Sequence, residues 1–212
     1  MKCVLNPVEI RILGVLIEKQ MSTPDYYPMT LNALINACNQ KTNRDPVMNL
    51  DEAAVEKALD SLRSQRLVWQ VKVQGSRALK YEHNIKAIAE FSDSEIAILC
   101  ELLLRGSQTG GELRSRTVRL TEFPGLSAVE HTLQKLIDHE KGPFAIKLPR
   151  APGQKENRYA HLFSEEDYSQ ELSPIPEVKD DRIGILEKKV DDLNDELNDL
   201  REQFFEFKKQ FE

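Results

Sequence analysis

The strongest constraint on the fold is a pattern of predicted elements that occurs twice in the 212 residues. Each copy begins with an apolar helix that follows a capping box, at residues 6–9 in the first copy and 92–95 in the second. Two further helices follow, and the third contains the pattern V-E-x-x-L-x-x-L, which starts at Val55 and again at Val129. Two short segments after it predict a β-hairpin. Three helices and a hairpin are the elements of a winged helix, so we expect two such domains in tandem.

This repeat predicts an α+β chain that is mainly α. The first copy predicts helices at 7–20, from 30 onward and at 50–66, with strands at 67–73 and 78–82. The second copy predicts a helix after 92, a short helix opened by a capping box at 109–112, a helix at 126–139, and strands at 144–148 and 157–162. The domains are then a winged helix at 1–90, a winged helix at 91–163, an acidic linker at 164–181 and a coiled-coil helix at 182–212. Two unrelated small α+β units are the alternative.

One segment also carries a family resemblance. Residues 22–50, STPDYYPMTLNALINACNQKTNRDPVMNL, resemble the signature of the YceH-like bacterial proteins of unknown function, and the core CNQKTNRDP at 38–46 is the most specific part. The segment that begins GELRSRT at Gly111 is also similar, so the resemblance covers roughly residues 4–165. It implies two tandem winged-helix domains and supplies neither an activity nor catalytic residues.

The charge is distributed unevenly along the chain. The 29 basic and 35 acidic residues give a net charge of −6, but residues 1–163 are weakly basic and residues 164–212 are strongly acidic. No window is apolar enough to span a membrane, and no secretory signal is visible. Three scattered cysteines do not form a disulfide framework, so we expect a cytoplasmic protein without membrane partners.

The acidic tail contains an unbroken heptad repeat. Its apolar residues are spaced alternately three and four apart: Ile183, Leu186, Val190, Leu193, Leu197, Leu200, Phe204, Phe207 and Phe211. Branched residues at most a positions and leucine at most d positions favour a parallel two-stranded coiled coil, and Arg182 would face Glu187 across it. We therefore predict a homodimer through this helix. The alternative is that the apolar stripe folds back onto its own chain.

Residues for catalysis or metal binding are nearly absent from the sequence. The four histidines have no cysteine or histidine at ligand spacing, so we expect no metal and no cofactor. No phosphate loop, nucleophile elbow or dinucleotide motif is present. Cys38 has Lys41 one turn away and could be reactive, but an inert helix residue is the favoured interpretation. We expect no enzyme.

Basic residues suggest nucleic-acid binding, although they do not lie where a winged helix reads bases. The third helix of each domain, at 51–66 and 126–139, is not basic. The cations lie in the hairpins, in the signature loop at residues 38–46, and near the second helix of the second domain. The candidate contacts with DNA phosphates are Lys41, Arg44, Lys72, Arg77, Arg114, Arg116, Arg119, Arg150, Lys155 and Arg158. Ordinary solvated surface is the alternative. Arg44 and Asp45 could instead stabilise the connection between the second and third helices of the first domain, so a structural role and a binding role are both open for this loop.

Two functions follow from this pattern. The first is a dimeric protein that binds duplex DNA, in a regulatory role, through basic wings and an arginine-rich helix-turn edge. The second is a protein–protein interaction scaffold, similar in outline to the winged-helix subunits of chromosome-segregation complexes, which the acidic third helices favour.

The heptad repeat makes a direct prediction about assembly. The full chain should sediment as a dimer and a chain ending at Glu177 as a monomer, because only the full chain contains the apolar stripe. Analytical ultracentrifugation of both chains tests this. Two monomers would show that the stripe does not pair.

Overall fold

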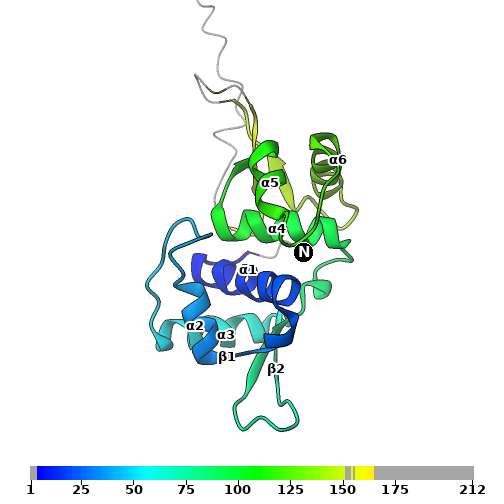
Figure 1. The fold of residues 1–212 in the computed structure, drawn as a ribbon. Helices are drawn as coiled ribbons and strands as arrows, with labels where there is room; N and C mark the ends of the chain where they lie inside the picture. Colours follow the sequence, from blue (N-terminus) through cyan, green and yellow to red (C-terminus); the bar gives the residue numbers. More distant parts are fainter. Residues whose placement is uncertain (1–3, 151–153, 155, 165–212) are drawn as a thin grey trace, which may run out of the picture. The chain divides into compact units, whose positions relative to one another are not determined.

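The computed structural model describes residues 4–150, 154 and 156–164. That part is α+β and mainly helical, with six α-helices and two small antiparallel sheets (Figure 1). The first half contains α1 (Pro7–Ser22), a 3-10 turn η1 (Pro24–Tyr26), β1 (Met29–Thr30), α2 (Leu31–Cys38), α3 (Glu52–Ser64), β2 (Val68–Val71), β3 (Lys80–His83) and a second turn η2 (Ile85–Ala87). The second half contains α4 (Asp93–Arg105), β4 (Gln108–Thr109), α5 (Gly110–Thr117), α6 (Leu126–Ile137), β5 (Ala145–Lys147) and β6 (Arg158–His161). The predicted coiled coil lies outside the described residues.

The predicted capping boxes are confirmed at three helix starts. At α1, the Asn6 side chain accepts from the backbone N–H groups of Val8 and Glu9, and the Glu9 carboxylate accepts from the backbone N–H of Asn6 at 2.8 Å. The same reciprocal bonds join Ser92 to Glu95 at α4 and residues 109 to 112 at α5. Such bonds satisfy backbone donors that a helix leaves free, and they are encoded within four residues of sequence.

Each half also contains a two-residue strand that the sequence did not predict. β1 and β4 lie directly before a helix and pair with the last strand of their half, so the sheet orders are β1-β3-β2 and β4-β6-β5. Met29 pairs with Tyr81, and Thr109 pairs with Arg158. A two-residue strand has no detectable periodicity, so only its pairing partner reveals it.

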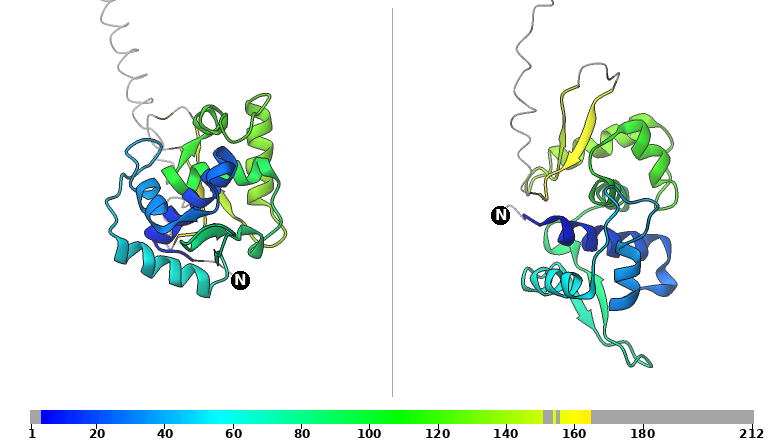
Figure 2. Two further views of the ribbon diagram at one scale, coloured as in Figure 1. Left: turned by 60° about the horizontal axis from the view of Figure 1, so that its bottom comes forward. Right: turned by 90° about the vertical axis from the view of Figure 1, so that its left-hand side faces the viewer.

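The two halves share one hydrophobic core in a single compact unit. α1 is buried on all sides from Glu9 to Glu18 and lies alongside α4, and the two hairpins point away from this contact in opposite directions (Figures 1 and 2). Gly14 allows the helices to approach closely, because a Cβ built there would lie 3.0 Å from Leu104 Cδ2 and 3.1 Å from Leu103 Cβ. The Cys100 thiol donates to the Gly14 carbonyl at 3.5 Å.

This close contact predicts the effect of adding one methyl group. Gly14→Ala should lower the free energy of unfolding by about 1 kcal/mol or more, because crowding in a packed core costs ~1–3 kcal/mol and the gain in helix propensity is smaller. Urea denaturation followed by circular dichroism measures the change. Gly111→Ala is the matched control in α5, where a Cβ would meet nothing closer than 3.9 Å, and it should leave stability unchanged or raise it. If both changes stabilise equally, the contact between α1 and α4 is looser than described.

Candidate nucleic-acid interface

Arg44, a predicted nucleic-acid contact, is buried in an ion pair with Glu18 of α1. Its Nη2 donates to Glu18 Oε2 at 2.6 Å and its Nη1 to Glu18 Oε1 at 3.2 Å. The side chains of Arg44 and Glu18 are 0% and 1% exposed. Arg44 Nε also donates to the carbonyl of Ala37 at 3.1 Å. Arg44 therefore fastens the signature loop to α1, and we leave it out of the proposed DNA-binding surface.

Other buried groups close the same loop. Arg11, 1% exposed, donates from Nη1 to the carbonyl of Cys38 at 3.2 Å and from Nη2 to that of Pro46 at 2.6 Å. The Asn39 side chain bonds both backbone groups of Leu50 at 2.8 Å. These bonds satisfy loop backbone that would otherwise be unpaired, which supports the structural interpretation of the signature.

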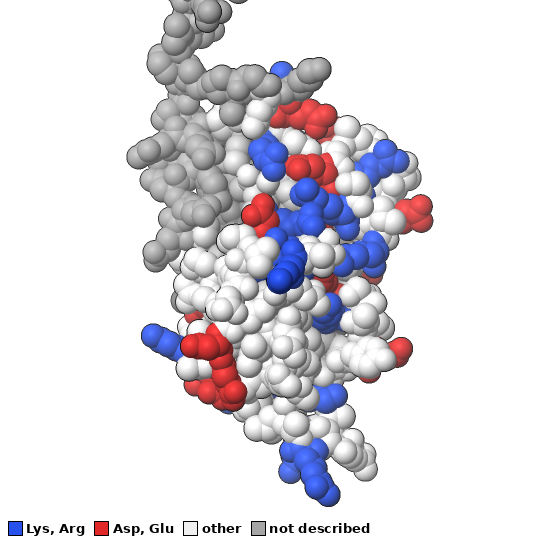
Figure 3. Space-filling view, turned by 60° about the vertical axis from the view of Figure 1, so that its left-hand side comes forward, with Lys and Arg blue, Asp and Glu red and all other residues white. Residues whose placement is uncertain are grey.

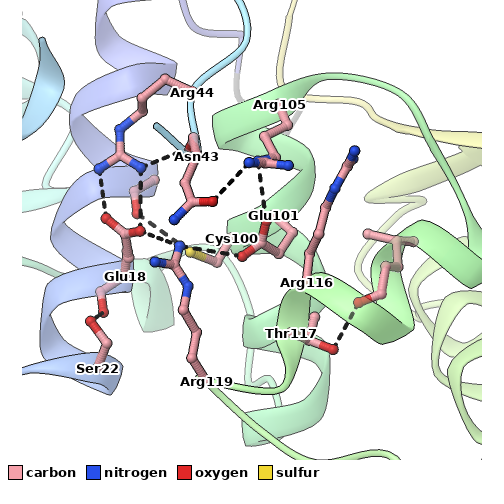
Figure 4. A network of polar contacts seen from close by, with 12 residues as sticks. Glu18, Ser22, Asn43, Arg44, Cys100, Glu101, Arg105, Arg116, Thr117 and Arg119 are labelled. Atoms are coloured by element: carbon pink, nitrogen blue, oxygen red, sulfur yellow. Dashed lines mark hydrogen bonds and ion pairs between the residues drawn. The ribbon is translucent and has the colours of Figure 1, made fainter. Parts of the chain in front are cut away.

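Glu18 also connects the first half to the second. Arg119, after α5, donates from Nη2 to Glu18 Oε1 and lies 3.7 Å from Glu101 Oε1 on α4. Arg105 Nε lies 3.8 Å from Glu101 Oε2, and its Nη2 donates to Asn43 Oδ1 at 2.8 Å (Figure 4). We call Glu18, Arg44, Glu101, Arg105 and Arg119 the seam cluster. It places two nearly inaccessible carboxylates and three guanidinium groups where the halves meet.

The two carboxylates have different electrostatic surroundings. Burial raises the pKa of Glu18, but the hydrogen bond and charge of Arg44, together with the charges of Lys19 and Arg119, more than offset this, so its pKa lies below the ordinary value. Burial raises the pKa of Glu101, and the charges of Arg119 and Arg105 offset only part of that rise. Glu101 Oε1 makes no hydrogen bond with a described residue. Ionised Glu18 therefore stabilises the fold, whereas ionising Glu101 costs free energy.

Two more predicted contacts, Arg116 and Arg158, share one carboxylate. Arg116 Nη2 lies 3.2 Å from Glu112 Oε1, and Arg158 Nη2 lies 3.1 Å from Glu112 Oε2. Arg116 Nη1 also donates to Gln108 Oε1 at 2.6 Å, and Arg158 Nη2 to the carbonyl of Ser107. Both side chains are about one third exposed, so they border solvent with part of their charge already paired.

The other predicted contacts are free of such pairing. Lys41, Lys72, Arg77 and Arg114 are exposed and form no ion pair with another described residue. Arg150 is exposed and donates weakly to Asn157 at 3.4 Å, and Lys155 lies outside the described residues. Lys72 and Arg77 flank the turn of the first hairpin, and Arg150 follows β5 in the second. Figure 3 shows basic side chains at the lower tip of one face and across its middle and upper part.

The third helices present mixed charge, as the sequence predicted. The exposed residues of α3 and its cap include Asp51, Glu52, Glu56 and Asp60 beside Lys57 and Arg63. On α6, a shallow depression is lined by Glu95, His131, Gln134, Lys135, Asp138 and His139. The His139 ring packs on Phe91 and Phe144, which fits a packing role better than a catalytic one.

The described residues offer little reactive chemistry. Cys38 and Cys100 are both fully buried, and burial raises the pKa of Cys38 to about 12, so its thiol is not ionised near neutral pH. Within residues 4–150 and 156–164, histidine, cysteine and acidic side chains form no group of three that could hold a metal ion. No helix in this part of the chain is long and apolar enough to cross a membrane.

Sequence reasoning missed Glu18, Glu101 and Arg105 as members of one cluster. Each is charged and lies in or at the end of a long apolar helix, and a charge among buried residues needs a partner. That signal was present in the sequence. The identity of the partners was not, because Glu18 and Arg119 are 101 residues apart.

Comparison with known proteins shows that the whole chain has relatives. The model of a family described as "Protein of unknown function, DUF480" matches residues 5–154. A UPF0502 protein of Geotalea daltonii is 48% identical over 220 residues, which cover 100% of both chains. A UPF0502 protein of Saccharophagus degradans is 46% identical, with 96% and 99% of the chains covered. The UPF0502 protein YceH of Escherichia fergusonii is 43% identical, with 94% and 97% covered.

The seam cluster predicts unequal effects of two matched substitutions. At neutral pH, Glu18→Gln should lower the free energy of unfolding by about 3–5 kcal/mol, because it leaves the buried Arg44 charge uncompensated. Glu101→Gln should change it far less, because Glu101 accepts no hydrogen bond at Oε1 and its charge is already costly. Urea denaturation of both variants measures the difference. Equal losses would contradict the assignment of Glu18 as the central carboxylate.

Urea denaturation of the wild-type protein and both variants at lower pH is the control, because the two carboxylates lose their charge there. The pKa of Glu18 is lowered on folding, so its contribution is present above its ordinary value of 4.5 and is lost as the pH falls through the lowered value. The difference in stability between the wild-type protein and Glu18→Gln should therefore begin to shrink below pH 4.5 and disappear only below the lowered pKa of Glu18. The pKa of Glu101 is raised, so its cost appears as the pH rises above 4.5 and is absent from Glu101→Gln.

Proposed function

The chain belongs to the DUF480 family of bacterial UPF0502 proteins, the YceH-like family that its sequence resembles, and from its surface we propose that it binds duplex DNA without catalysing a reaction. The fold is compatible with two winged-helix domains, because each half contains three helices and a three-stranded sheet whose last two strands form a hairpin. In such domains the hairpin is a wing that contacts the DNA backbone.

The observation that carries the proposal is the position of the unpaired cations. Lys72 and Arg77 lie beside the turn of one hairpin and Arg150 beyond the first strand of the other, with Arg114 on α5 and Lys41 in the signature loop. Phosphate contacts draw their affinity from cations that can release counterions on binding, and an arginine already paired with a carboxylate releases fewer. The hairpin ends therefore supply the strongest contacts.

The charge of the third helices sets the expected mode of recognition. On α3 and its N-cap, four exposed acids outnumber Lys57 and Arg63, and Arg63 is paired with Asp60 at 3.0 Å. The acids of these helices would repel DNA phosphates. Binding therefore depends on contacts between cations elsewhere and the DNA backbone, so the affinity falls steeply with salt and depends weakly on DNA sequence. Dimerisation through residues 182–212 would double the number of contacts and supply avidity in a regulatory role.

A protein-interaction scaffold is the second candidate function. Besides the acidic exposed side of α3, it is favoured by Trp69 on β2, which is 44% exposed and flanked across the hairpin by Glu82. Exposed tryptophan is typical of contacts with other proteins. This function predicts a protein partner and no affinity for duplex.

The proposal is tested by salt-dependent mobility shifts with random duplex. Lys72→Ala with Arg77→Ala, and separately Arg114→Ala with Arg150→Ala, should each reduce the slope of log affinity against log salt by up to ~2, about 0.9 for each lost phosphate contact. Lys57→Ala with Arg63→Ala also removes two exposed cations, from α3, and is the matched control that should leave the slope unchanged.

Three outcomes are informative. No binding at ~50 mM salt would overturn the DNA proposal and favour the scaffold. An equal loss of slope in the α3 control would mean that net charge rather than the hairpins carries the affinity. An unchanged slope in both the Lys72/Arg77 and the Arg114/Arg150 variants would place the contacts elsewhere.

A further inference from the structure

Basic side chains outnumber carboxylates in the ion pairs of Glu18, Glu101 and Glu112. Glu18 and Glu101 lie where the two halves meet, and Glu112 pairs within the second half; the three acids form ion pairs with six basic side chains, Lys19, Arg44, Arg105, Arg116, Arg119 and Arg158. The carboxylate of Glu101 interacts with the charges of three arginines, Arg105, Arg116 and Arg119, and in the opposite sense with the charge of Glu18. These three arginines come from α4, α5 and the turn after α5 (Figure 4). Cations gathered in this way repel one another unless an anion joins them.

One guanidinium of this group has an unused buried donor. Arg105 Nε is inaccessible and makes no hydrogen bond with a described residue, and the nearest carboxylate oxygen, Glu101 Oε2, is 3.8 Å away. A buried donor without an acceptor costs free energy, most of all in a charged group. Burial lowers the pKa of Arg105, and the charges of Arg116 and Arg119 lower it further. An anion at the exposed side of these arginines would offset the repulsion between their charges, and it could accept from Arg105 Nε only if that side chain turned toward it.

The same group is accessible from solvent. The side chains of Arg105, Arg116 and Arg119 are 19%, 32% and 38% exposed, so all three border solvent although Arg105 Nε itself is inaccessible. Glu101 opposes an anion, and its Oε1 lacks a hydrogen bond as well. Removing the Glu101 charge should therefore raise the affinity for an anion, whereas removing an arginine should lower it.

We propose that Arg105, Arg116 and Arg119 bind a phosphate group at the contact between the two halves. A phosphate group offers several acceptor oxygens to planar guanidinium donors and carries the charge that the excess of arginines requires. Because Arg119 is tied to α1 through Glu18 and Arg105 belongs to α4, the bound group would stabilise the contact between these helices. Both a small phosphorylated molecule and a DNA backbone present this chemistry.

The site is tested first without DNA. Inorganic phosphate, compared with chloride at equal ionic strength, should raise the melting temperature of the full chain saturably and bind with one site per chain in calorimetry. Arg105→Ala and Arg116→Ala should each weaken binding by roughly tenfold or more, the effect of losing a charge-assisted hydrogen bond. Glu101→Gln should tighten it. Arg63→Ala, an exposed and ion-paired arginine of α3, should have no effect.

The outcomes separate a binding site from a structural cluster. Circular dichroism shows whether each variant is folded, and tighter binding by Glu101→Gln cannot result from a loss of structure. The proposal is overturned if phosphate acts no differently from chloride, or if the Arg105 and Arg116 variants bind phosphate like the wild type.

Competition with duplex distinguishes the two sources. If duplex displaces phosphate and Arg105→Ala lowers the salt slope of DNA binding by ~0.9, the site holds a backbone phosphate. If phosphate binds equally with saturating duplex present, the site takes a small phosphorylated molecule. The first test stands even if DNA binding fails, because it contains no DNA.

Discussion

The buried pair of Glu18 and Arg44 is the interaction on which the rest of the structure depends. Two charges with almost no exposure are stable only while they face each other, because either one alone would be an uncompensated buried charge. Arg44 fixes the loop before α3, Glu18 belongs to α1, and Glu18 Oε1 also accepts from Arg119 in the second half. The carboxylate of Glu18 thus holds three segments together, α1, the loop before α3 and the turn after α5, which are far apart in sequence.

Sequence predicts most of this fold where the physics is local. Capping boxes at residues 6–9, 92–95 and 109–112 fix three helix starts because every partner lies within four residues. β1 and β4 could not be predicted, since two residues form a strand only when a distant strand pairs with them. The contact of α1 with α4 was also missed, although Gly14 inside an apolar helix is the kind of residue that permits a close approach.

The candidate site was predicted only in part, because a sequence counts arginines without showing which are paired. Arg44 was equally compatible with a structural and a binding role, and its burial against Glu18 supports the structural one. Arg116, Arg119 and Arg158 border the surface but share carboxylates, whereas Lys72 and Arg77 are unpaired at a hairpin turn. These differences arise from tertiary neighbours, and no local pattern reports them.

The opposed directions of the two hairpins have a geometric consequence. Because α1 and α4 pack through one core, the hairpin of β2 and β3 and the hairpin of β5 and β6 extend from that common core (Figures 1 and 2). The separation between the outer ends of β2 and β5, at Val71 and Lys147, is therefore set by core packing rather than by a linker. A partner that contacted both strand ends would have to match this separation with its own two contact points.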